Sequence, residues 1–319
     1  MQTPLSVLLR LNRQLRYRFA CARHAMRRAV FARLSFAGVE RVALLRWLIG
    51  SLFDARSRAS GIARYEAGRM DVGLAREHAL RTMSADLRQR LLDECLYAGR
   101  ALHRDTWPDL RAAGAHVAQR IREIQAREPG RAVLLSPFHH VSQYANIYVI
   151  DEVRKALGLA SIAVVSGVPR DVYGEDAAMI PSVPVLYTYD SDSEQRNRLG
   201  LRVARALRRD GVLAIFADAA PFSLAKYPME TVGVTMSGRA ARVHNGVFRL
   251  GAPIDACLLP FYLTLSNGRF DVQVGEPVDL AASDAPQRLA GAIDAARRHN
   301  YPDWLFAGHP CGYHFAPTR

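Results

Sequence analysis

The second part of the chain alternates short apolar runs with amphipathic stretches, and this alternation constrains the fold more than any other feature. Six apolar runs are expected to form buried strands, at residues 132–136, 161–165, 183–187, 212–216, 254–265 and 270–274. Helical patterns lie between them at 193–209 and 242–250. This order predicts an α/β fold, with a mixed, mostly parallel sheet flanked by helices on both faces.

The residues before about 128 have helical character instead. The stretches 74–98 and 110–127 are rich in alanine, leucine, arginine and glutamate, and Pro129-Gly130 interrupts the pattern. We expect a basic helical arm over residues 1–70 and a single α/β domain over residues 71–319. Half of the 319 residues are hydrophobic and 23% are charged, which excludes a disordered chain and a multi-pass membrane protein.

The positive charge is concentrated in the arm. Residues 1–70 hold 14 arginines and only Glu40, Asp54 and Glu66 as acids, so nearly all of the net charge of +13 lies there. A basic arm on an almost neutral body predicts an anionic partner: a membrane surface, an acidic carrier protein or nucleic acid. We expect no nucleic-acid partner, because no nucleic-acid-binding motif accompanies the charge.

Periodicity favours the membrane surface. Thr3-Pro4 is typical of a helix start. Apolar side chains then recur every three or four residues, at Leu8, Leu11, Leu15, Phe19, Ala22, Met26 and Val30, with arginines around the rest of the helix. A basic amphipathic helix of this kind is typical of a segment that lies on anionic lipid. The alternative is a surface helix that packs on its own domain.

No segment has the pattern of a transmembrane helix or a signal peptide. The best candidate span, 36–53, contains Glu40, Arg41 and Arg46, and its uncharged runs fall far short of the ~20 residues that a bilayer requires. We therefore expect a peripheral protein on the cytoplasmic face of the inner membrane.

Two histidines follow the first predicted strand. The strand 132–136 leads into Pro137-Phe-His139-His140. In open α/β sheets, sites lie beyond the carboxyl ends of the strands. His139 is therefore a candidate general base and His140 a supporting neighbour. The alternative for both is a structural histidine. The other histidines have no ligand spacing, and we expect neither a metal site nor a cofactor.

Several blocks, taken in order, resemble a known enzyme family. They are Ala132-Val-Leu-Leu-Ser-Pro-Phe-His139, Asp210-Gly-Val-Leu-Ala-Ile-Phe-Ala-Asp218, Val234-Thr-Met-Ser-Gly-Arg239-Ala-Ala, Asn245-Gly-Val-Phe-Arg-Leu-Gly-Ala-Pro-Ile254 and Pro302-Asp-Trp304. The series resembles the late lipid A acyltransferases, the lauroyl and myristoyl transferases of the lysophospholipid acyltransferase superfamily. The similarity covers roughly residues 95–310.

The resemblance implies an acyltransferase. Its donor would be an acyl thioester of acyl carrier protein or coenzyme A, and its acceptor a hydroxyl or amine of a lipid or other amphiphile. On this basis His139 is the expected base, with His140 in support and Asp218 as a possible orienting acid. Arg239 is an expected anion contact, and the expected substrate-binding set also includes Gly238, Tyr144 and Arg170.

The chain departs from the family pattern at the catalytic acid. The family places an acid after the histidine with four residues between them, but here that position is Tyr144 counted from His139, or Ala145 counted from His140. Three alternatives remain. An acid comes from elsewhere, with Asp218, Glu175 and Asp176 as candidates; the reaction needs no acid; or the protein is a catalytically silent lipid-binding or scaffold protein on the same fold.

Overall fold

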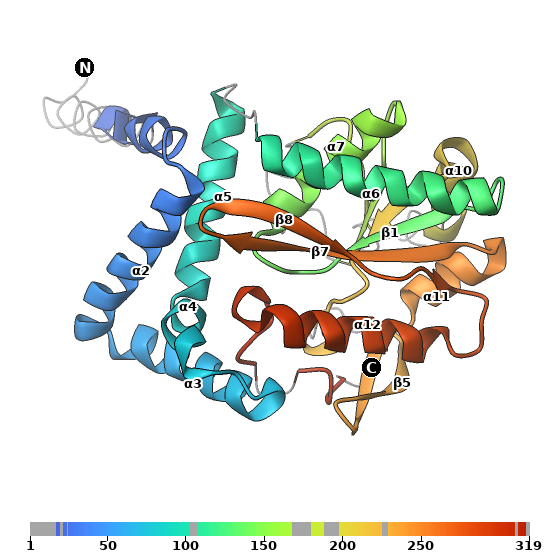
Figure 1. Ribbon diagram of the computed structural model, residues 1–319. Coiled ribbons are helices and arrows are strands. Elements are labelled where there is room, and N and C mark those ends of the chain that lie inside the picture. The colour runs from blue at the N-terminus through green and yellow to red at the C-terminus, as the bar shows by residue number, and fades with distance from the viewer. Residues whose placement is uncertain are drawn as a thin grey trace, which may run out of the picture.

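The fold is an α/β sheet with helices on both faces, as predicted (Figure 1). The computed structural model describes residues 17–19, 22–23, 25–102, 107–167, 180–187, 198–224, 229–309 and 312–316. Its main sheet has the strand order β3-β2-β4-β1-β7-β8, and β9 pairs with β7. The strands are β1 (Val133–Pro137), β2 (Val164–Ser166), β3 (Val185–Tyr187), β4 (Val212–Ile215), β7 (Cys257–Ser266), β8 (Arg269–Val274) and β9 (Val278–Asp279).

The sheet is mixed and mostly parallel. Strands β1, β2, β3, β4 and β7 run parallel to their neighbours, whereas β8 and β9 run antiparallel to β7. In the centre, Val133 of β1 is in register with Val212 of β4 and with Cys257 of β7. Each of the six predicted strands overlaps a strand of this sheet. The run 254–265 begins later than expected, because Ala252–Ile254 forms a short 3-10 helix.

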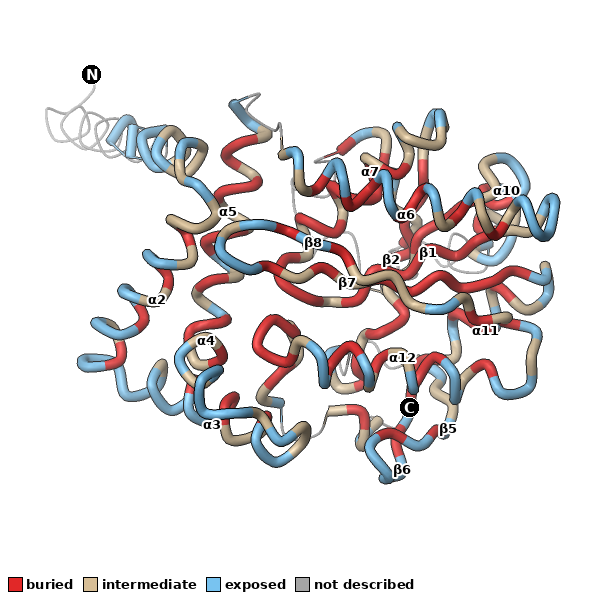
Figure 2. The backbone as a smooth tube through the Cα atoms, viewed as in Figure 1, coloured by how far each residue is buried: buried red, intermediate tan, exposed pale blue. Residues whose placement is uncertain are grey.

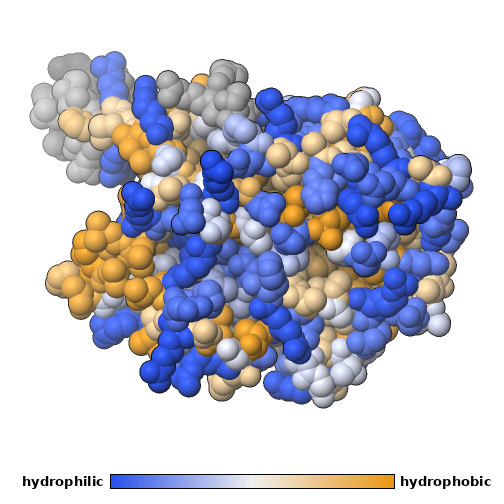
Figure 3. Space-filling model, viewed as in Figure 1, coloured by the Kyte–Doolittle hydropathy of each residue, from blue (hydrophilic) through white to orange (hydrophobic). Residues whose placement is uncertain are grey.

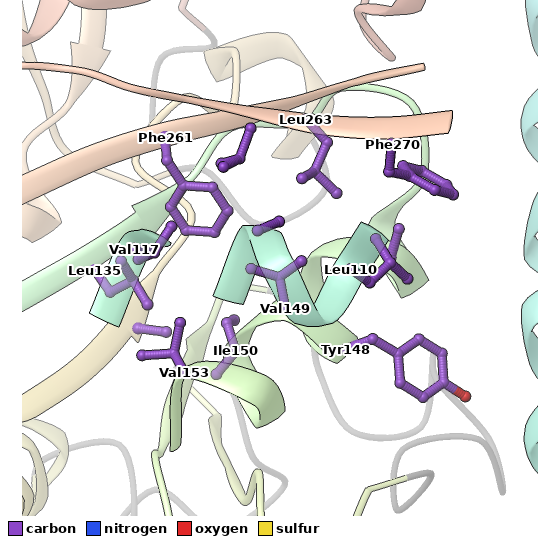
Figure 4. Packing of buried hydrophobic residues seen from close by; sticks show 14 of the residues in the cluster. Leu110, Val117, Leu135, Tyr148, Val149, Ile150, Val153, Phe261, Leu263 and Phe270 are labelled. Atoms are coloured by element: carbon purple, nitrogen blue, oxygen red, sulfur yellow. The ribbon is translucent and has the colours of Figure 1, made fainter. Parts of the chain in front are cut away.

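Alternate residues of the buried strands pack into two separate cores. Val133 and Leu135 lie in one core and Leu134 lies in the other, since successive side chains of a strand point to opposite faces. The first core is covered by α5 (Ala85–Ala101), α6 (Pro108–Arg127) and α7 (Gln143–Leu157); Figure 4 shows part of it. The second is covered by α10 (Leu199–Asp210), α11 (Gly246–Gly251) and α12 (Ala285–Asn300).

The predicted helix at 242–250 is wrong in its first part. Thr231–Met236 and Arg239–His244 form an antiparallel hairpin, β5 and β6, and α11 begins only at Gly246. In β6, buried Ala241 and Val243 alternate with exposed Ala240 and Arg242, which is the period of a strand. The predicted helix at 193–209 corresponds to α10, although residues 193–197 lie outside the described part of the chain.

The N-terminal helices form a layer against the domain. They are α2 (Phe36–Phe53), α3 (Ala55–Val72) and α4 (Ala79–Met83), followed by α5. The described residues between 17 and 31 are helical, while residues 1–16 of the predicted amphipathic helix lie outside the description. Helix α2 packs on α5 and α3 packs on α4, so this part of the predicted arm belongs to the body of the molecule. In the described part of the chain, no helix is long and apolar enough to cross a membrane.

Two helical glycines provide a matched test of the packing. A Cβ added at Gly114 of α6 would lie 2.5 Å from the Glu152 Cβ of α7, whereas a Cβ at exposed Gly291 of α12 would meet nothing within 4 Å. We expect Gly114→Ala to lower the free energy of unfolding by about 1–3 kcal/mol through overpacking. We expect Gly291→Ala to raise it by about 0.5–1 kcal/mol. Urea unfolding measures both, and equal effects of the two changes would contradict this packing.

Candidate active site

The two loops that follow β1 and β4 leave the sheet toward opposite faces. After β1 the chain enters α7 on one face, and after β4 it continues to the β5–β6 hairpin and α11 on the other. Because β1 and β4 are parallel neighbours, their carboxyl ends lie side by side. A crevice forms where neighbouring loops diverge in this way, and ligands of open α/β sheets bind there. His139 follows β1 and Asp218 follows β4, so both stand at this point.

His139 and Asp218 form a doubly hydrogen-bonded pair. The Nδ1 atom of His139 lies 2.7 Å from Asp218 Oδ1, and the backbone N–H of His139 donates to Asp218 Oδ2 at 2.6 Å. The Asp218 side chain is fully buried, whereas the His139 side chain is 13% exposed. Of the candidate acids, Asp218 is thus the one that the structure brings into contact with His139.

This pairing assigns the tautomer of His139. A carboxylate accepts hydrogen bonds, so the Nδ1 atom carries the proton and donates it to Asp218. The Nε2 atom then holds a lone pair, and none of the described residues hydrogen-bonds to it. A partly exposed imidazole with a free Nε2 lone pair and a buried carboxylate behind it is the arrangement of a general base.

Asp218 is held from its other side by Tyr313. The Tyr313 hydroxyl donates to the backbone oxygen of Asp218 at 2.5 Å, and its buried ring stacks on Trp304. Burial raises the pKa of Tyr313 well above its ordinary value, so the hydroxyl remains a donor. The backbone N–H of Ala217 donates to Ser136 Oγ of β1 at 3.2 Å, which ties the two loops together.

The loop that carries His139 is folded into two consecutive three-residue turns. The N–H of His140 donates to the carbonyl of Phe138, and the N–H of Ser142 donates to the carbonyl of His140, both at 2.7 Å. In the second turn, the backbone angle φ of Val141 is 63°, which lies in a region that β-branched residues avoid. Such strain amounts to about 1–3 kcal/mol and persists only where surrounding contacts hold it.

The contact that holds Val141 comes from a distant segment. The backbone N–H of Val141 donates to the backbone oxygen of Asp303 at 2.7 Å. The backbone N–H of Leu305 donates to the backbone oxygen of His139 at 2.8 Å. Asp303 lies in the 3-10 helix η5 (Tyr301–Asp303), directly before Trp304. The Pro302-Asp-Trp304 block of the sequence therefore frames the histidine loop.

Asp303 is itself fixed by buried arginines of the N-terminal helices. Its carboxylate is 1% exposed and pairs with Arg81 of α4 at 2.9 Å and with Arg88 of α5. Burial alone would raise the pKa of this carboxyl, but Arg88 and Arg81 outweigh burial and hold the pKa below its ordinary value. Arg64 of α3 donates to the Trp304 oxygen at 2.5 Å. Three N-terminal helices thus position the frame of the site.

His140 is buried behind the loop. It is 1% exposed, its ring lies 5.0 Å from that of Tyr262, and its Nδ1 atom has no hydrogen-bond partner. Burial lowers the pKa of His140 to about 4, which outweighs the opposite effects of Asp218 and Asp303. The ring is therefore uncharged at neutral pH. The supporting role expected for His140 stays a prediction.

The remaining predicted residues lie apart from the pair or outside the description. Gly238 lies in the two-residue turn between β5 and β6 and has a φ of 72°, because such a turn requires positive φ. Arg239 follows this turn and is exposed. In the described part of the chain, no hydrogen bond or ion pair links Arg239 to His139 or Asp218. Tyr144 is half-buried in the first turn of α7. Three more candidates lie outside the described residues: Arg170, Glu175 and Asp176.

Two features near the site were missed in the sequence. The ring centroid of Phe306 lies 4.8 Å from that of His139, and the ring centroid of Phe216, which follows β4, lies 4.7 Å from it, so the imidazole has two aromatic neighbours. Asp93 of α5 accepts from Ser142 Oγ at 2.5 Å and from the Tyr144 backbone, at the start of α7. Burial raises the pKa of Asp93 to about 7, in spite of these hydrogen bonds. No local sequence pattern marks Phe306 or Asp93, because only packing brings these residues to the loop.

Neither a scan against protein-family models nor a comparison with curated proteins found a match to this chain. Within the described residues, no group of three or more histidine, cysteine, aspartate or glutamate side chains is arranged to hold a metal ion.

The ion pairs of Asp303 generate a stability prediction. Asp303→Asn leaves the buried charge of Arg88 without its counterion, so we expect the free energy of unfolding to fall by about 3–5 kcal/mol. The control is Glu276→Gln, whose side chain is 88% exposed and which should change stability by less than about 0.5 kcal/mol. Urea unfolding at pH 7 measures both. A loss below about 1 kcal/mol for Asp303→Asn would show that the network does not support the fold.

The buried ring of His140 predicts a pH dependence. Its folded-state pKa of about 4 lies below the ordinary value of 6.5, so the unfolded chain binds a proton that the folded chain rejects between these values. Above pH 6.5 the ring is uncharged in both states, and the free energy of unfolding is at its highest. As the pH falls toward 4, only the unfolded chain takes up the proton, so the free energy of unfolding decreases. Between pH 7 and pH 4, the free energy of unfolding of the native protein should fall by about 3 kcal/mol more than that of His140→Gln. Urea unfolding at several pH values tests this, and a constant difference would refute it.

Proposed function

We propose that this protein is an acyltransferase that acts on a lipid or other amphiphile at the membrane surface. The donor would be a fatty acyl thioester of acyl carrier protein or coenzyme A, and the acceptor a hydroxyl or an amine. The observation that carries the proposal is the His139–Asp218 pair at the carboxyl ends of two neighbouring parallel strands. We place the enzyme on the cytoplasmic face of the inner membrane as a peripheral protein.

The proposed reaction uses the free nitrogen of His139. As the acceptor oxygen or nitrogen attacks the thioester carbonyl carbon, its proton passes to Nε2 of His139. Asp218 stabilises the imidazolium that forms and keeps the ring in orientation. The tetrahedral intermediate then collapses, the C–S bond breaks, and the imidazolium returns the proton to the leaving thiolate. The products are the acyl ester or amide and the free thiol.

The buried acid favours catalysis over the silent alternative. A lipid-binding or scaffold protein was favoured by the absence of a carboxylate at Tyr144 and Ala145. Asp218 supplies a carboxylate from another segment: it is fully buried and accepts two hydrogen bonds from His139, which supports proton transfer by the imidazole. The walls of Phe216 and Phe306 suit an apolar substrate beside the base. Arg239 and Arg170 remain proposed contacts for anionic groups of the substrates.

Thiol release tests the proposal. Long-chain acyl carrier protein and acyl-coenzyme A serve as donors and a membrane lipid extract as acceptor. His139→Ala should abolish lipid-dependent release, and Asp218→Asn should reduce turnover by up to about 10⁴, the loss seen when the corresponding acid of a serine protease is neutralised. The control is His116→Ala, an exposed position on α6, which should behave as the native protein.

The opposite result has a clear meaning. If the native protein releases no more thiol than His139→Ala with either donor, the catalytic proposal fails and the lipid-binding alternative takes its place. If release depends on His139 but not on Asp218, the pair is not the catalytic unit. Mass spectrometry of the lipid products identifies the acceptor when release is seen.

A further inference from the structure

The outer side of α2 is apolar and uncovered. We call this surface the α2 face; it consists of Val42, Leu45, Leu48, Ile49, Leu52 and Phe53. Phe53 is 86% exposed and Leu52 is 73% exposed. Figure 3 shows the corresponding hydrophobic patch at the left edge of the molecule, where Figure 1 places α2. A contiguous patch of large apolar side chains on a surface marks an interaction site.

The rest of α2 is used for packing on the domain. The inward positions Val39, Ala43, Trp47 and Ser51 recur every four residues and are buried. In a helix this stripe lies opposite Leu45 and Leu52, so one side faces the domain and the other faces outward. Figure 2 shows this alternation of buried and exposed positions along α2. The fold therefore accounts for the inner stripe of α2 but not for the apolar character of the α2 face.

Positive charge surrounds the α2 face. Arg41 and Arg46 of α2 and Arg56 of α3 are exposed, and none of them forms an ion pair within the described residues. Of the nearby acids, Glu40 pairs with Arg81 at 2.9 Å. Exposed Asp54 caps α3 by accepting from the Arg56 backbone at 3.0 Å and keeps its negative charge, so the arginines outnumber the one acid that forms no ion pair. Among the residues that the structure describes, the α2 face is thus bordered by arginines that form no ion pair.

We propose that the α2 face inserts into the interface of an anionic lipid bilayer, with α2 parallel to the membrane plane. The strip supplies apolar side chains for the acyl-chain boundary, and the flanking arginines meet lipid phosphates. A second copy of this chain fits less well, since a symmetric contact would bring uncompensated arginines together. The inference rests on the proposed function, for which it names the surface that contacts the lipid.

A chain of polar contacts connects the helix α2 to the site. Glu40 of α2 pairs with Arg81, Arg81 pairs with Asp303 at 2.9 Å, and the Asp303 oxygen holds Val141 of the histidine loop. Glu40 also accepts from the Gly268 backbone of the β7–β8 turn at 2.8 Å. Insertion of α2 would therefore set the orientation of the whole domain on the membrane.

Vesicle flotation tests this surface. The full-length protein is mixed with vesicles of phosphatidylcholine alone, or of phosphatidylcholine with phosphatidylglycerol. The native protein should float with the anionic vesicles, and the double variant Leu52→Asp, Phe53→Asp should bind them about tenfold or more weakly. The matched control is Leu201→Asp on α10, where an exposed leucine lies outside the α2 face and binding should be unchanged. Arg41→Gln with Arg46→Gln should remove the preference for phosphatidylglycerol.

Several results would overturn the inference. One is a native protein that does not bind anionic vesicles, and another is a double variant that binds them as the native protein does. A third is a native dimer in sedimentation without lipid that the double variant abolishes, because the α2 face would then belong to a second copy. Circular dichroism verifies that each variant is folded.

The failure of this inference is distinguishable from the failure of the proposed function. His139→Ala should bind anionic vesicles as the native protein does, whether or not the protein is an enzyme. The α2 double variant should still release thiol when the acceptor lipid is dispersed in detergent. Loss of that detergent-phase activity would assign α2 a role in the site and contradict a purely membrane-binding surface.

Discussion

Asp303 is the buried charge on which the arrangement of this protein depends. Its carboxylate pairs with Arg81 and Arg88, and its backbone oxygen holds Val141 in a strained conformation. A carboxylate with 1% exposure is tolerable only because these cations compensate the loss of water. The same residue thus couples the N-terminal helices to the loop that carries His139. We conclude that the helical layer is a structural part of the site rather than an appendage.

The proposed base and the carboxylate that contacts it follow two different strands. His139 follows β1 and Asp218 follows β4, so the strand pairing of Val133 with Val212 determines whether they meet. The segment just after His139 holds no carboxylate at the position expected for one, which is Tyr144, with four residues between it and His139. In this protein that segment is the start of α7, whose N-terminus is held instead by Asp93 through Ser142 and Tyr144. The carboxylate that contacts His139 comes instead from the loop after the neighbouring strand β4.

The arginines of this chain serve two opposite purposes. Arg64 and Arg88 are buried and bind carboxylates or carbonyl oxygens that frame the site. Arg41 and Arg46 stay exposed beside an apolar helix face. Guanidinium groups suit both situations, because they remain charged when buried and offer several donors in a fixed geometry. Because Arg64 of the arm is buried in this way, the net charge of the arm overstates the charge that is available to a partner.

Local sequence patterns were sufficient for much of the fold. The apolar runs predicted the strands of the main sheet, since burial on both faces leaves a continuous apolar signature. The short hairpin partner β6 was mistaken for a helix, because six residues of mixed character do not define a period. The position of His139 at a strand end was also evident from the sequence.

The decisive contacts of the site required the tertiary structure. The sequence by itself determined an α/β sheet with a histidine pair after its first strand, and it named Asp218 among three possible acids. Only the tertiary structure selected Asp218, which lies 79 positions from His139, and only packing brought Asp303, Asp93 and Phe306 to the loop. Strand and helix patterns arise from neighbouring residues, whereas hydrogen bonds between distant segments depend on which strands become neighbours in the sheet and on how their following loops pack.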